Sequence, residues 1–272
     1  MTAPKPIGHE HRLGVGFQHR IITAVWILFC AGLLPETMLG RDIRYYIKRD
    51  GFSWKTESAT NIIIYFEPGT HAEREIAQLK TQFERSLQSV EELLGTSPYT
   101  RRIHVFVLES GERKKALMGD EGWGSAIPKL NAVFGVINRR GDGCSTHEFC
   151  HVIAGNLWGK PERWIDEGLA TYADERWRSR IHAAAKDLSA QGRLLHLDRM
   201  FREFLQYPEA VAHVEAGSFV RFLHEKSGTE KLKKIWQTGH AKISKITGQS
   251  MEIIEKEWHN AFESAQSVAA TP

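Results

Sequence analysis

Apolar residues recur along this chain with the two spacings that distinguish strands from helices. Residues 61–66 and 131–138 are nearly continuous apolar runs, and apolar positions alternate with others through residues 102–108. Each run has the length of a strand, so three β-strands are expected. A helix is expected between the first two, because apolar residues recur every three or four positions from Ile76 to Leu94.

The rest of the chain shows mainly helical spacing. A short helix is expected from Ser110 to Met118, followed by a loop at residues 122–124. Residues 193–262 carry apolar positions at helical spacing only. Strands alternating with helices, then helices alone, predict an α+β fold with a small mixed sheet in its N-terminal lobe and an all-helical C-terminal lobe.

Composition narrows the class of protein. The 272 residues are 42% hydrophobic and 25% charged, which is typical of a globular protein with one large or two small domains. The net charge is +3 and no run of Lys and Arg is dense, so no nucleic-acid partner is expected. The three cysteines do not form a disulfide framework, and Cys150 is expected to be a small buried residue rather than a partner of Cys144.

The N-terminal part has the features of an export segment. Residues 21–34 contain no charge and follow a polar leader with Lys5, Arg12 and Arg20. The length fits the core of a signal peptide and is short for a spanning helix, although a short anchor or a buried core helix are alternatives. The basic flank predicts that the following residues are exported, so the membrane is an expected partner if residues 21–34 are not cleaved.

The pattern therefore predicts five segments along the chain. They are a leader with a signal peptide or anchor (1–40), a polar linker (41–60), an α/β lobe (61–192), a helical lobe (193–263) and a disordered tail (264–272).

A His-Glu-x-x-His motif carries the candidate chemistry. His147 and His151 are four residues apart, so on a helix they lie on one face and can bind one metal ion. Glu148 lies beside them, where its carboxylate can take a proton from a water molecule held by the metal. An alternative is structural, because Ser145 and Glu148 also have the spacing of a capping box at a helix start.

A second motif, Trp164-Ile-Asp-Glu-Gly-Leu-Ala, offers Glu167 as a third ligand. A break at residues 159–161 allows its helix, expected from Trp164 to about Arg180, to fold back on the first. Two His and one carboxylate leave one position of a tetrahedral Zn²⁺ open, as in catalytic zinc sites. Asp166 points about 100° away from Glu167 on a helix, so it is not an equivalent ligand.

Together these two motifs resemble those of the gluzincin zinc metallopeptidases, and in particular the compact group with a Trp-x-x-Glu-Gly-x-Ala helix. The likeness extends loosely from about Asn61 to Phe262. It implies a zincin-like lobe that binds one Zn²⁺ through His147, His151 and Glu167 and hydrolyses peptide or protein substrates.

The resemblance also implies further parts of an active site. The strand before the metal helix, residues 132–137, would lie at a sheet edge where a substrate backbone can pair with it; an internal core strand is the alternative. His213 stands where the compact group has a Tyr that stabilises the oxyanion. Tyr172 and Tyr207 are weaker candidates for that role, and a structural His213 is the alternative.

Two points are left open by the sequence. Asp174 either holds a His ring in place or is a solvated charge, and the second interpretation is favoured. The whole domain is either a peptidase with Glu148 as general base or a gluzincin-like domain that binds a metal or a partner without catalysis. A membrane-anchored helical interaction protein with a chance motif is a third hypothesis.

Overall fold

The computed structural model describes residues 41–265, and within them six strands form one mixed sheet. The strand order is β1-β2-β3-β5-β4, with β6 paired to β5. Strands β2, β3 and β5 run parallel, whereas β1, β4 and β6 are antiparallel to their neighbours. The strands are β1 (Lys55–Ala59), β2 (Ile62–Phe66), β3 (Ile103–Leu108), β4 (Gly124–Ile127), β5 (Ala132–Asn138) and β6 (Gly141–Asp142).

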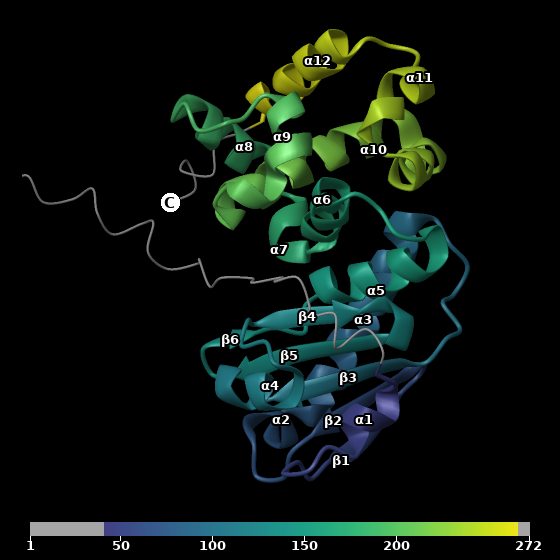
Figure 1. Ribbon diagram of the computed structural model, residues 1–272, viewed down its shortest axis with the longest axis vertical. Helices are drawn as coiled ribbons and strands as arrows, with labels where there is room; N and C mark the ends of the chain where they lie inside the picture. The colour runs from purple at the N-terminus through teal and green to yellow at the C-terminus, as the bar shows by residue number, and fades with distance from the viewer. Residues whose placement is uncertain (1–40, 266–272) are drawn as a thin grey trace, which may run out of the picture.

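Helices cover the sheet and then build a separate helical layer (Figure 1). The first five are α1 (Ile43–Ile47), α2 (His71–Arg74), α3 (Ile76–Leu94), α4 (Gly111–Met118) and α5 (Thr146–Trp158). The others are α6 (Arg163–Ala173), α7 (Glu175–Arg178), α8 (Ile181–Ala190), α9 (Leu197–Glu203), α10 (Glu209–Thr238), α11 (Ile243–Thr247) and α12 (Met251–Glu263). Short 3₁₀ turns lie at Pro128–Leu130, Phe204–Gln206 and His240–Lys242.

Alternation along the strands divides the core into two parts. In β3, Val105 and Val107 face the large core that includes α3, α5 and α6, whereas Phe106 and Leu108 face a smaller core with α1 and α4. This period of two follows from the pleat, which sends successive side chains to opposite faces. Helix α5 lies on the large-core side of the sheet, between the sheet and the helical layer (Figure 1).

The three strands and the first long helix expected from the sequence are present. Helix α3 ends at Gly95, whose φ of 58° is left-handed and suits a glycine at a helix end. Ser110 caps α4 by accepting a hydrogen bond from the backbone N–H of Arg113, as a helix start requires. The α+β class with a mixed sheet is confirmed, and the arrangement into two lobes stays a prediction.

Two expectations about this part of the chain were wrong, and one strand was not predicted. Residues 41–60 are not a linker, because they contain α1 and β1, and β1 pairs with β2. Residues 132–137 are not an edge, because β5 lies between β3 and β4. The loop expected at 122–124 is present at residues 122–123, but Gly124 already begins β4, whose four residues are too short and too rich in small side chains to show a strand pattern.

The predicted membrane segment, residues 21–34, lies outside the described residues. Among residues 41–265, no helix combines the length and the apolar character needed to cross a bilayer.

Candidate metal centre

Helix α5 presents the two histidines of the first motif toward one point. His147 and His151 are 5% and 8% exposed, and their Nε2 atoms lie 3.1 Å apart. The structure does not support a capping role for Ser145 and Glu148, because the Ser145 side chain makes no capping hydrogen bond. The backbone N–H of Glu148 bonds instead to the carbonyl of Ser145.

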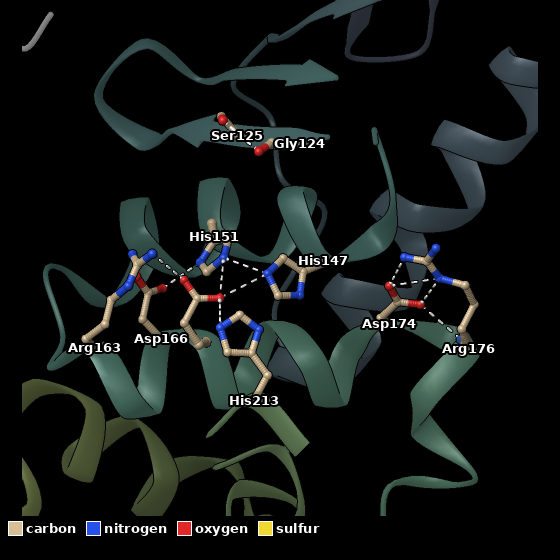
Figure 2. A network of polar contacts seen from close by, with 10 residues as sticks. Gly124, Ser125, His147, His151, Arg163, Asp166, Asp174, Arg176 and His213 are labelled. Atoms are coloured by element: carbon tan, nitrogen blue, oxygen red, sulfur yellow. Dashed lines mark hydrogen bonds and ion pairs between the residues drawn. The ribbon is translucent and has the colours of Figure 1, made fainter. Parts of the chain in front are cut away.

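Helix α6 adds the third side chain (Figure 2). Glu167 is fully buried, and its Oε2 lies 3.1 Å from the Nε2 of His147 and 3.5 Å from the Nε2 of His151. These three ligand atoms all lie within 4.8 Å of one another. The structure therefore brings together the three residues that the sequence predicts as ligands, although they come from two helices.

The spacing of these atoms fits a zinc ion. Zinc–nitrogen distances of about 2.0–2.1 Å and tetrahedral angles set neighbouring ligand atoms about 3.3 Å apart. The three observed separations of 3.1, 3.1 and 3.5 Å lie close to that value. Imidazole and carboxylate are also the donors that zinc prefers, so this buried group could hold a metal ion.

The electrostatics of the cluster also favour a cation. Burial opposes the charge of Glu167, yet the imidazoles of His151 and His147 prevail and hold its pKa well below the usual range. Burial likewise lowers the pKa of His151, but Asp166 and Glu167 raise it further, to well above its ordinary value. The cluster thus attracts positive charge, which either a proton or a metal ion can supply.

Asp166 orients one of the histidines. Its Oδ1 lies 2.7 Å from the Nδ1 of His151, so the carboxylate accepts a hydrogen bond from that ring nitrogen. This contact fixes the ring and leaves Nε2 directed at Glu167 and His147, which is the usual arrangement behind a metal-bound histidine. The sequence did not predict this role of Asp166, because the direction of a side chain on one helix does not identify its partner on another.

Arg163 contacts the other side of the carboxylate ligand. Its Nη2 lies 2.7 Å from Oε1 of Glu167, one turn away on α6, and its Nη1 lies 3.8 Å from Asp166. The guanidinium therefore holds one oxygen of Glu167 while the other faces the histidines. The i, i+4 spacing in the sequence could have indicated this pair.

Glu148 lies where α5 meets β4 at the edge of the sheet. It is 3% exposed, and burial raises its pKa despite the neighbouring histidines. A β-carbon at Gly124 would lie only 2.4 Å from the Oε1 of Glu148, so glycine is required for β4 to pass this carboxylate. In Figure 2, Gly124 and Ser125 of β4 lie above α5, whose His147 and His151 rings point down toward α6. The edge strand beside the site is thus β4, in place of the expected residues 132–137.

A close contact between α6 and α10 brings in His213. A β-carbon at Gly168 would lie 2.8 Å from the carbonyl oxygen of Ala216, so glycine lets the two helices approach. The Nε2 of His213 then lies 3.7 Å from Oε2 of Glu167. Its ring stacks on Phe204, with centroids 5.8 Å apart, which fixes its plane.

His213 is a neutral imidazole at physiological pH. It is largely buried, and burial lowers its pKa to about 4. It does not belong to the tight group of three ligand atoms, yet it faces the same space in Figure 2. The other two candidates for the oxyanion role point elsewhere: the hydroxyl of Tyr172 lies 3.4 Å from His224, and that of Tyr207 donates to Glu203 at 2.9 Å.

Asp174 is not a solvated charge, and this preferred interpretation was wrong. It is 3% exposed, caps α7 through the N–H of Arg176 and forms an ion pair with the Arg176 guanidinium at 2.5 Å. Helix α6 ends at Ala173 because of this cap, which explains why the expected helix does not reach Arg180 unbroken. Cys144 and Cys150 are both buried and free, so no bridge joins them.

No protein-family model and no curated protein matches this chain. Solved structures match it weakly. Native yeast LTA4 hydrolase is 14% identical with a TM-score of 0.42, over 79% of this chain and 38% of that one. The same yeast enzyme in complex with bestatin is 13% identical with a TM-score of 0.39, over 78% of this chain and 37% of that one. An aminopeptidase N family protein from Idiomarina loihiensis is 12% identical with a TM-score of 0.34, over 79% of this chain and 45% of that one.

This chain therefore spans less than half the length of those proteins. With TM-scores below 0.5 the likeness is weak, and the case for a function rests on the site itself.

Proposed function

We propose that this chain is a zinc-dependent metallopeptidase that hydrolyses peptide bonds in peptide or protein substrates. One observation carries the proposal. Three buried ligand atoms from His147, His151 and Glu167 converge with separations suited to zinc, and Glu148 lies beside them at the edge of the sheet. A structural zinc site would instead have four protein ligands and no adjacent buried carboxylate.

His147, His151 and Glu167 are the residues that would hold the metal. A bound zinc ion supplies Lewis acidity, which polarises a carbonyl group and makes water acidic near neutral pH. Glu148 acts as the general base, and its raised pKa keeps it able both to accept the proton from the attacking water and to return it to the leaving amine. Asp166 and Arg163 keep His151 and Glu167 in position throughout.

The developing negative oxygen needs a hydrogen-bond donor, and His213 is the candidate for that role. As a neutral imidazole it can donate one N–H without adding a charge that would repel the metal. Its stacking on Phe204 restricts the ring, so little reorganisation is needed during the reaction.

The edge strand β4 is the candidate surface for the substrate backbone. Within the part of the chain that the structure describes, it pairs with β5 alone, and Gly124 lies against Glu148. A peptide added beside β4 would have its backbone fixed by main-chain hydrogen bonds, which hold any sequence in an extended form. This supports a peptide substrate over a small molecule.

The test is the substitution Glu148→Gln. It keeps the size of the side chain and all three ligands but removes the base, so zinc content should stay the same while hydrolysis of fluorescently labelled casein falls by about 10²–10⁴-fold. The matched control is Glu203→Gln, because Glu203 pairs with Arg199 and Tyr207 away from the cluster. Activity in this control should be unchanged.

The same experiment distinguishes a peptidase from a non-catalytic binding domain. If the wild-type chain binds zinc but cleaves neither casein nor any member of a random peptide library, it is a metal- or partner-binding domain on this scaffold. If Glu148→Gln hydrolysed casein as fast as the wild type, the general-base role of Glu148 would be contradicted.

The proposal includes a location on the exported side of a membrane, where residues 21–34 anchor the chain if they are not cleaved. The absence of charge in that segment and its basic flank support it. In sealed membrane vesicles of known orientation, added trypsin should digest the domain only from the exported face. Digestion only from the opposite face would contradict this location.

A further inference from the structure

Helix α1 (Ile43–Ile47) and the residues next to its two ends carry a group of cations on one outer surface, here called the outer face of α1, which lies far from α5 and α6 in Figure 1. Arg41, Arg44, Lys48 and Arg49 line a shallow hollow of about 580 Å³ together with Tyr45 and two acids, Asp42 and Asp50. Lys48, Arg49 and Arg44 are exposed, as expected for side chains that meet solvent or a partner.

Most of these cations have no acidic partner. Asp42 caps α1 and pairs with Arg44, so this acid is already used. Arg41 and Arg49 lie over the ring of Tyr45, at 4.0 and 5.3 Å from its centroid. Among residues 41–265, no ion pair joins an acid to Arg41, Lys48 or Arg49.

The inner face of α1 fixes the direction of this surface. Tyr46 is fully buried, and Ile43 and Ile47 pack beside it against the smaller core, one helical turn apart. The helix cannot turn its cations inward without exposing these three side chains. The charged face is therefore held outward by the fold.

The length of chain before α1 identifies the partner. The uncharged run 21–34 ends seven residues before Arg41. Seven residues span at most about 25 Å when fully extended, so a run held in a bilayer keeps α1 close to the headgroups. Cations and a half-buried tyrosine at this distance complement anionic phospholipids.

We propose that the outer face of α1, formed by Arg41, Lys48, Arg49 and Tyr45, binds the surface of a membrane that contains anionic phospholipids. In Figure 1 α1 lies beside the sheet, at the opposite end of the molecule from α11 and α12. Docking through α1 thus leaves α5 and α6, which carry the candidate metal ligands, open to substrate. The inference rests on the proposed anchorage by residues 21–34 but not on peptidase activity.

The test uses the full-length chain reconstituted in two kinds of vesicle. One contains phosphatidylcholine alone, and the other also contains about 30% phosphatidylglycerol, which makes its surface anionic. Hydrogen exchange is followed for the peptides that cover residues 41–50. On the anionic vesicles, exchange there should be about tenfold slower than on neutral vesicles, because docking protects the helix. High salt should remove the difference, since the attraction is screened.

Two triple variants complete the design. Arg41→Gln/Lys48→Gln/Arg49→Gln leaves the Asp42 cap intact and should abolish the lipid-dependent slowing. Arg74→Gln/Arg139→Gln/Arg140→Gln removes the same charge from another cation-lined hollow and should retain it.

Equal exchange of residues 41–50 on both kinds of vesicle would overturn the proposal. So would slowing that persists in the first variant, or slowing that both variants lose alike, because the effect would then follow net charge rather than this face of α1.

Discussion

Among residues 41–265, two buried groups that contain histidine differ in what surrounds the imidazole rings, and one of them could hold a metal ion. In the first, the Nε2 atoms of His147 and His151 face each other and a carboxylate. In the second, the Nδ1 of His182 meets the hydroxyl of Ser218, which also accepts a hydrogen bond from Trp258. A hydroxyl can both donate and accept, whereas the first cluster contains acceptors that only a cation can satisfy together.

The contrast shows what distinguishes a site from a core histidine. Both clusters are shielded from solvent, so burial does not separate them. The pKa values do: burial lowers the pKa of His182 to about 4, whereas the carboxylates Asp166 and Glu167 raise that of His151. His151, held beside two carboxylates, attracts a positive charge, whereas His182 favours its neutral form and bonds to Ser218 within the core.

The largest effect that would test this contrast is loss of a ligand. His147→Ala should reduce zinc affinity by at least about 10³-fold, because two ligands no longer enclose the ion. His182→Ala should leave zinc affinity unchanged but lower the free energy of unfolding by about 1–3 kcal/mol, since a buried hydrogen bond and packing are lost. Chelator competition and urea denaturation measure the two quantities. A metal defect in His182→Ala would remove the distinction between the clusters.

A smaller effect is expected from the residue that orients His151. Asp166→Asn keeps the shape but weakens the hydrogen bond to Nδ1, so zinc affinity should fall by about 10–100-fold. The control Asp187→Asn changes a carboxylate of α8 and should have no effect. Unchanged affinity in Asp166→Asn would mean that packing alone holds the ring of His151.

The third effect is on folding stability rather than on zinc affinity, and it concerns pH and the second cluster. The pKa of His182 is about 6.5 in an unfolded chain and about 4 when folded, so the unfolded state binds more protons between these values. Stability contributed by neutral His182 is therefore complete above pH 6.5 and is lost as pH falls toward 4, by about 2–3 kcal/mol. Denaturant titrations at pH 7 and pH 5 should show a steeper loss in wild type than in His182→Gln. Parallel curves would contradict this assignment.

Local spacing was enough to find the centre of the site. His147 and His151 share a helix, and four residues put them on one face whatever the fold. Glu167 follows a short break, which allows few arrangements other than a return of the helix. The regular strands β2, β3 and β5 were found for the same reason, since each shows its own apolar pattern.

Features that depend on contacts between distant segments were not found. Strand β4 has only four residues and no apolar alternation, so its place at the edge depends on pairing with β5. Helix α1 and strand β1 are polar on one side and were taken for a linker. Asp166 and Asp174 gained their roles from partners that no spacing rule links to them, His151 on α5 and Arg176 after a helix break.

The central claim is that His147, His151 and Glu167 form one zinc site. It is tested most directly by the zinc content of the purified full-length chain, measured by mass spectrometry for wild type, Glu167→Ala and the control Glu203→Ala, with circular dichroism to verify folding. The account predicts about one zinc per chain in wild type and control and little in Glu167→Ala. A folded wild-type chain that takes up no zinc even from excess metal would contradict it.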